Sequence, residues 1–66
     1  MVGPNGYTIK VVDNSTLRVY SSNGDTRIRL LYSPEHGEAI FGNPSPQEIV
    51  ALREDLDYAR GKLSWN

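Results

Sequence analysis

The sequence predicts an α+β domain in which a three- to four-stranded antiparallel meander is covered on one face by a single C-terminal helix. Two observations lead to this prediction. Apolar and polar residues alternate in three segments of the first half, as they do in half-buried strands. The second half holds a capped segment with apolar residues at helical spacing. Because the chain has 66 residues, we expect one small domain over 1–66.

The three strands are expected at about 7–13, 17–22 and 25–32. In the first strand, Tyr7, Ile9 and Val11 share one side, and Lys10 lies on the other. A three-residue loop at 13–15 would place Lys10 opposite Arg18, whereas a two-residue loop would mix the polar and apolar faces. The three-residue loop is therefore the prediction.

The second and third strands are joined by an Asn-Gly pair at 23–24. Asn-Gly supplies the two positive-φ residues of a type I′ turn. A two-residue loop at this place sets Val19 opposite Ile28 and Arg18 opposite Arg29. Like charges that face each other directly destabilise a sheet, so the two arginines suggest a functional surface. The apolar face of these two strands consists of Leu17, Val19, Ile28, Leu30 and Tyr32.

A short fourth strand at 38–41, after a tight turn around Gly37, is left open as an alternative to a loop. The segment Ser45-Pro46-Gln47-Glu48 combines an N-cap, a proline at the first helical position and a capping box. It predicts a helix over 46–62. The apolar stripe consists of Ile49, Leu52, Leu56, Ala59 and Leu63, and the outward residues are Glu48, Ala51, Glu54, Asp55, Tyr58 and Lys62. Trp65 is expected to fold back over the helix end, with an exposed anchor as the alternative.

Composition excludes several classes of function. The chain has no cysteine, which removes disulfides, thiolate metal sites and a cysteine nucleophile. Its net charge is −1, which argues against a protein devoted to phosphate contacts. The charge is uneven, since residues 1–33 hold four cations against two acids, and residues 34–66 hold three cations against six acids. No apolar run is long enough for a membrane span, so we expect a cytoplasmic protein without a membrane partner.

The chain offers little for catalysis or for cofactor binding. His36 is the only histidine and stands in a Pro/Gly loop without an orienting partner at a known spacing, so a solvated loop residue is favoured. Glu54, Asp55 and Asp57 lie within one helical turn, but such a cluster is usually a solvated helix face. We therefore expect no enzyme, no cofactor and no metal site.

The solvent face of the sheet is the better candidate for a binding site. Its expected residues are Lys10, Arg18, Tyr20, Arg27, Arg29 and Leu31. A basic row beside an aromatic ring could contact phosphates, and strands can read a groove of duplex DNA. Exposed tyrosine, leucine and arginine side chains also have the composition of a protein-binding surface. An ordinary exposed surface, on which long basic side chains cover aliphatic neighbours, is the third interpretation.

In the order of its elements, the chain is similar to the three-stranded sheet plus C-terminal helix of AP2-type and phage-integrase arm-binding DNA domains. This similarity implies that the sheet would enter a major groove. It concerns the order of elements alone and carries no residue of those families onto this chain.

Together these observations predict a non-catalytic binding protein, a small regulator or inhibitor that docks its basic sheet face on a protein with an acidic surface. The low net charge favours protein over nucleic acid, and DNA binding by the same face is the alternative. A monomer or weak homodimer is expected. Compact proteins of this kind are common among accessory factors of viruses and mobile elements, and on that frequency alone we expect such an origin.

Overall fold

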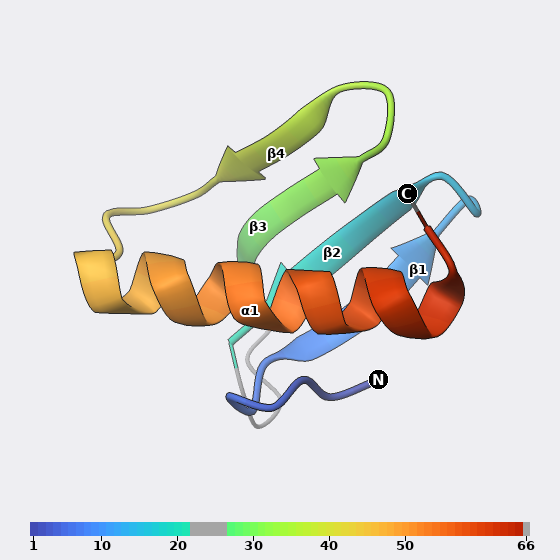
Figure 1. Cartoon of the computed structure of the whole chain (residues 1–66). Coiled ribbons are helices and arrows are strands. Elements are labelled where there is room, and N and C mark those ends of the chain that lie inside the picture. Colours follow the sequence, from blue (N-terminus) through green and yellow to red (C-terminus); the bar gives the residue numbers. More distant parts are fainter. Residues whose placement is uncertain (22–26, 66) are drawn as a thin grey trace.

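The computed structural model describes residues 1–21 and 27–65. It confirms the α+β class, with four antiparallel strands in the order β1-β2-β3-β4 and one C-terminal helix on one face of the sheet (Figure 1). The elements are β1 (Thr8–Val12), β2 (Thr16–Tyr20), β3 (Ile28–Ser33), β4 (Gly37–Ile40) and α1 (Pro46–Leu63). The fourth strand, which the sequence left open, is therefore present. The expected turn at 23–24 lies outside the described residues.

The first hairpin has the predicted register. Lys10 lies opposite Arg18 and Val12 lies opposite Thr16, so 13–15 form the expected three-residue loop. A short turn at 34–36 leads into β4 through Gly37, whose φ of 78° lies in the region that glycine adopts most readily.

The predicted register of β2 against β3 is wrong by two residues. Val19 lies opposite Leu30, and Arg18 lies opposite Leu31 instead of Arg29. A shift by an even number of residues leaves every side chain on its own face of the sheet. The apolar pattern therefore fits both registers equally well, and only the assumed turn had distinguished them.

A β-bulge at the start of β3 changes which side chains reach solvent. Tyr20 lies opposite Ile28, although its neighbour in β2 lies opposite Leu30, so Arg29 is the extra residue of the bulge. Ile28 then shares a face with Tyr20, because directly opposite residues of an antiparallel pair point to the same side. The prediction that Ile28 belongs to the apolar face is thereby corrected.

The core lies between the sheet and α1. Its buried residues are Ile9, Leu17, Val19, Leu30, Leu52, Leu56 and Ala59. Trp65 packs against this core, and its backbone N–H donates to the Arg60 carbonyl at 2.8 Å. The expectation that Trp65 folds back over the helix end is confirmed.

The helix begins as the sequence predicts. The Ser45 hydroxyl oxygen accepts from the Glu48 backbone N–H at 3.2 Å, and Glu48 Oε1 accepts from the Ser45 backbone N–H at 3.3 Å. These two bonds form a capping box, which satisfies donors that the first helical turn leaves free. The helix ends at Leu63, one residue beyond the expected end, and Ser64 caps it in the left-handed conformation.

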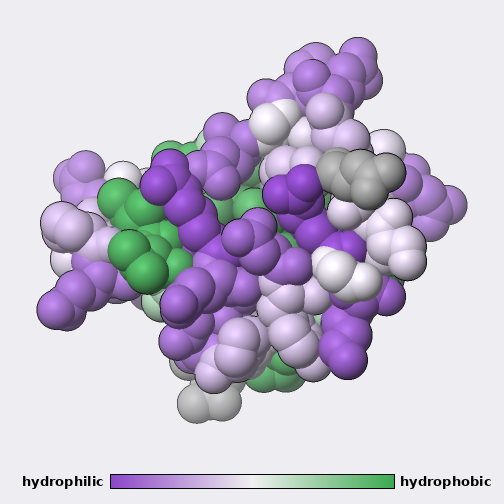
Figure 2. Space-filling model, in the orientation of Figure 1, coloured by the Kyte–Doolittle hydropathy of each residue, from purple (hydrophilic) through white to green (hydrophobic). Residues whose placement is uncertain are grey.

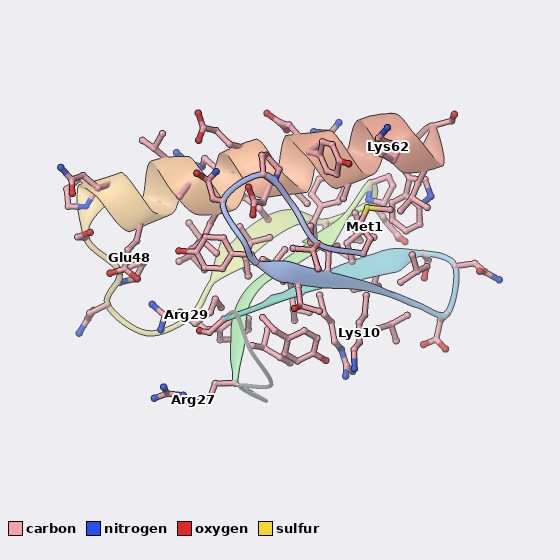
Figure 3. The ribbon with its side chains drawn as sticks, turned by 90° about the horizontal axis from the view of Figure 1, so that it is seen from below. Met1, Lys10, Arg27, Arg29, Glu48 and Lys62 are labelled. Atoms are coloured by element: carbon pink, nitrogen blue, oxygen red, sulfur yellow. The ribbon has the colours of Figure 1, made fainter. Side chains whose placement is uncertain are left out.

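Asp55 was predicted to face solvent, but its side chain is fully buried, with 0% of the residue exposed. The carboxylate accepts hydrogen bonds from the backbone N–H of Asn5 at 2.9 Å, the side-chain amide of Asn5 at 2.8 Å and the backbone N–H of Tyr7 at 3.1 Å. These donors come from the N-terminal turn, which lies over the helix (Figure 3). Helical periodicity alone carries no information about donors almost fifty positions away in the sequence.

The same N-terminal turn also covers part of the β1 edge. Val2 forms an antiparallel bridge to Thr8, and the Met1 carbonyl accepts from the backbone N–H of Ile9 at 2.7 Å. Residues 1–3 therefore run beside β1 like a short additional strand.

We expect Asp55→Ala to lower the free energy of unfolding by about 2–4 kcal/mol, because the substitution leaves buried N–H donors without an acceptor. Asp57→Ala is the matched control, since Asp57 lies on the same helix with 72% of its side chain exposed. We expect it to change stability by less than about 0.5 kcal/mol. Urea unfolding followed by circular dichroism measures both values, and equal losses would contradict the role given to Asp55.

Gly3→Ala tests the close packing of the turn on the helix. A Cβ at Gly3 would overlap the carboxylate of Asp55, whereas a Cβ at Gly61 in α1 meets nothing within 4 Å. We expect Gly3→Ala to destabilise the protein by about 1–3 kcal/mol. Gly61→Ala should stabilise it by about 0.5–1 kcal/mol, because alanine is the better helix former. Thermal unfolding of both variants shows whether the melting temperature falls with Gly3→Ala and rises with Gly61→Ala.

Candidate functional site: the outer face of the sheet

The face of the sheet turned away from α1 has no element packed on it within the described parts of the chain (Figure 1). We call this surface the outer face. Strand alternation and the observed register assign to it Thr8, Lys10, Val12, Thr16, Arg18, Tyr20, Ile28, Leu31, Ser33, Gly37 and Ala39. Figure 3 shows the Lys10 side chain extending away from the helix.

One row of side chains crosses all the strands of the outer face. Lys10 lies beside Arg18, Arg18 beside Leu31, and Leu31 beside Ala39. The Lys10 Nζ also lies 5.5 Å from the centre of the Tyr20 ring. Charge thus gathers over β1 and β2, and apolar surface lies over β3 and β4. Among the described residues of the four strands, the outer face carries these two cations and no carboxylate.

A shallow hollow lies at the end of the outer face where the strands turn. Its volume is about 260 Å³, and its lining includes Thr16, Leu31, Ser33, His36 and Ala39. A second hollow of about 390 Å³ shares Thr16, Ser33 and His36 with the first and extends along the turns at 13–15 and 34–36. The apolar half of the outer face therefore ends in a depression that can receive a side chain.

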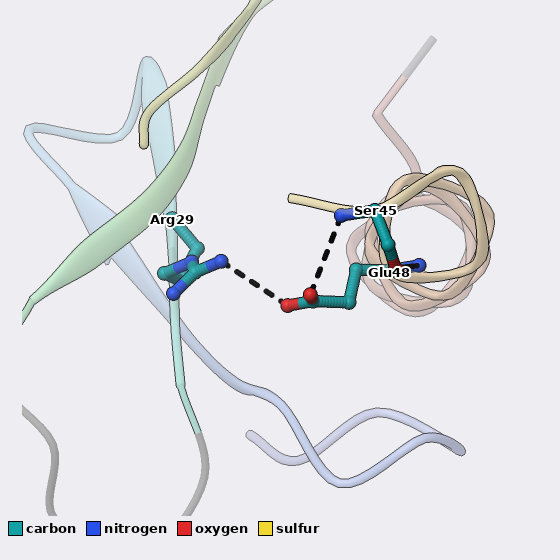
Figure 4. Close-up of polar contacts among 3 residues, drawn as sticks. All are labelled: Arg29, Ser45 and Glu48. Carbon is teal, nitrogen blue, oxygen red and sulfur yellow. Dashed lines mark hydrogen bonds and ion pairs between the residues drawn. The ribbon is translucent and has the colours of Figure 1, made fainter. Parts of the chain in front are cut away.

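Arg29 is not part of the outer face, in contrast to the predicted basic row. Its Nη2 forms an ion pair with Glu48 Oε2 at 3.2 Å, and 22% of its side chain is exposed (Figure 4). Figure 3 shows Arg29 directed toward the N-terminal end of α1, where Glu48 lies. The bulge explains this position, because the extra residue of a bulge departs from the strict alternation of a strand.

The other predicted site residues lie on the predicted side of the sheet, although Arg27 precedes β3 and does not pair with Tyr20 as expected. Lys10, Arg18, Tyr20 and Leu31 belong to the outer face. Arg27 is exposed and immediately precedes β3, and Figure 3 shows its side chain on the side of the sheet away from α1. Sequence reasoning missed Ala39, which strand parity would have placed on this face once β4 was known, and Ile28, whose position depends on the bulge.

The opposite side of the molecule has a different character. Figure 2 shows that the side bearing α1 is mainly hydrophilic. Two acidic groups on the side of the sheet that faces α1 form ion pairs, Glu38 with Arg53 at 2.7 Å and Asp57 with Arg60 at 3.5 Å. Cationic and acidic side chains are thus mixed on the helix side, whereas the described strand residues of the outer face include cations and no carboxylate.

His36 lies at the rim of the hollow, with 80% of its side chain exposed and its Nε2 3.9 Å from Glu35 Oε2. Within the described ranges, histidine and carboxylate side chains do not gather in groups of three that could hold a metal ion. No described helix has both the length and the apolar character required to cross a bilayer.

Glu48→Gln separates the ion pair to Arg29 from the capping box, because glutamine also serves at this position of the box. We expect a loss of less than about 1 kcal/mol in unfolding free energy. Glu48→Ala removes both contacts and should lose about 1–2 kcal/mol. Urea unfolding at low salt and at about 1 M salt measures the difference, since salt screens the exposed ion pair. If Glu48→Gln were as destabilised as Glu48→Ala, the capping box would not contribute separately from the ion pair, contrary to this prediction.

Comparisons with models of protein families, with curated proteins and with solved structures give no match. The geometry of the outer face is therefore the basis for assigning a function.

Proposed function

We propose that this chain is a non-catalytic binding protein, a small regulator or inhibitor that docks its outer face on an acidic surface of another protein. One observation supports the proposal above all others. The uncovered outer face combines Lys10 and Arg18 with apolar side chains, and its described residues include no carboxylate. Such a surface is complementary to a partner that presents acidic groups beside an apolar side chain.

The arrangement of the central row suggests how a partner would bind. Arg18 lies between Lys10 and Leu31, so one carboxylate of the partner could contact both cations while an apolar neighbour reaches the hollow near Leu31. Arginine and tyrosine are enriched at the residues that carry most of the binding energy in protein interfaces. Arg18 and Tyr20 are residues of those types on the strands of this face.

Protein is favoured over nucleic acid because the described cations on and beside this face are few, namely Lys10, Arg18 and Arg27. Nucleic-acid affinity depends on the number of phosphates that lysine and arginine neutralise. The ion pair with Glu48 holds Arg29 away from the outer face. The apolar groups around Leu31 and Ala39 would gain little from a phosphate backbone, whereas they fit the apolar centre of a protein interface.

Affinity capture with matched variants tests the proposal. Wild-type protein, Arg18→Ala, Leu31→Ala and Arg29→Ala are each immobilised, and proteins retained from a lysate of the source organism are identified and then titrated as purified partners. We expect a partner whose affinity falls at least about tenfold with Arg18→Ala and with Leu31→Ala, the size of one hot-spot residue. Arg29→Ala should bind as wild type does. A partner equally sensitive to all three substitutions, or to none, would contradict the proposal.

A parallel titration distinguishes nucleic acid from protein. Labelled duplex and single-stranded DNA and RNA are titrated at about 50 and 200 mM salt, a range over which phosphate-driven affinity falls steeply. We expect no binding that depends on Arg18. Binding that weakens strongly with salt, is lost in Arg18→Ala and is retained in Leu31→Ala would assign the outer face to nucleic acid instead.

A further inference from the structure

The two edges of the sheet differ in whether another segment pairs with them, a difference that plays no part in the proposed function. At the β1 edge, residues 1–3 run alongside the strand, and Ile9 N–H bonds to the Met1 carbonyl at 2.7 Å. At the β4 edge, Glu38 and Ala39 are exposed, and no described segment pairs with the strand on its outer side. Figure 1 shows β4 at the margin of the molecule, away from the axis of α1.

The register shows which backbone groups this edge offers. The Phe41 backbone N–H donates to the Arg29 carbonyl of β3 at 3.0 Å. Because hydrogen bonding alternates along an antiparallel strand, Ala39 also bonds toward β3, whereas the N–H and C=O groups of Glu38 and Ile40 point outward. An added strand would therefore find its hydrogen-bonding partners at Glu38 and Ile40.

We propose that β4 pairs with β4 of a second copy of this chain, in a two-fold antiparallel register centred on Ala39. In this arrangement Glu38 of each copy lies opposite Ile40 of the other, and the two sheets join into one of eight strands. The contact is isologous, so it closes at the dimer and does not propagate into a fibre. It satisfies all the outward backbone groups of Glu38 and Ile40 in both copies.

Side-chain size and charge favour this register. The two Ala39 residues would meet as a non-hydrogen-bonded pair, in which the strands approach most closely and small side chains fit. A register centred on Glu38 would instead place two carboxylates directly opposite each other, which is destabilising. In the register centred on Ala39, the ion pair of Glu38 with Arg53 at 2.7 Å keeps its charge compensated.

Edge pairing also keeps the cations of the two outer faces apart. Arg18 and its counterpart would be separated by five strand spacings of about 4.8 Å, or about 24 Å. This separation is well beyond the Debye length of about 8 Å at physiological ionic strength. Packing two outer faces against each other would bring the same cations together. The second copy is therefore better accommodated at the edge than on the face.

Engineered cysteines test the register, since the chain contains no cysteine of its own. In the proposed dimer the two Cα atoms at position 39 are about 4.5 Å apart, within the range of a disulfide. Two Cα atoms at position 41 would be about 14 Å apart, beyond that range. Under mild oxidation we expect Ala39→Cys to form a covalent dimer at least about ten times faster than Phe41→Cys, our order-of-magnitude criterion for proximity. Equal rates would overturn the proposal.

The mass of the unmodified protein provides the second measurement. Sedimentation equilibrium should show a monomer–dimer equilibrium, which Ile40→Pro shifts to monomer by removing one outward N–H while the ladder to β3 stays intact. A wild-type mass that stays monomeric into the millimolar range would overturn the proposal, whether or not Ile40→Pro folds. This result would leave the binding test of the outer face unaffected, because Arg18 and Leu31 lie on other strands.

Discussion

The carboxylate of Asp55 lies buried between α1 and the N-terminal turn, where it accepts hydrogen bonds from Asn5 and Tyr7. A carboxylate without water requires several donors in its place, and here they come from one turn of the chain. The turn is consequently fixed in position over the helix. The same segment holds residues 1–3 beside β1. The covering of this edge of the sheet therefore depends on Asp55, a residue in the middle of the helix.

The fold could be predicted largely because its signals are local. The alternation of β1 and β2, the three-residue loop at 13–15 and the capping box at Ser45 each depend on neighbouring residues, and the structure has all of them. The features that could not be predicted depend on contacts distant in sequence. The register of β3 differs by an even number of residues, which the apolar pattern cannot detect. The helical pattern alone places Asp55 on the polar side of α1, and its burial results from the contact with the N-terminal turn.

The candidate site could be predicted only in part, because strand parity is a local signal and the bulge in β3 is not. Lys10, Arg18, Tyr20 and Leu31 follow from strand parity, which survives a shift of two residues. Arg29 does not, because a single extra residue in β3 removes it from the row and brings it to Glu48. With Arg29 removed from the row and Ile28 beside Tyr20, the outer face is less basic and more apolar than the sequence indicates.

The connection from β4 to α1 is held to Arg29 at both of its ends. The Arg29 carbonyl accepts from the Phe41 N–H at the start of the connection, and its guanidinium contacts Glu48 just beyond the end. These two contacts fix the positions between which residues 42–45 run. The turn at 34–36 has no such double attachment and borders the hollow near Leu31. A change in the length of this turn would reshape the rim of the hollow, while the strands and the helix that carry the core keep their positions.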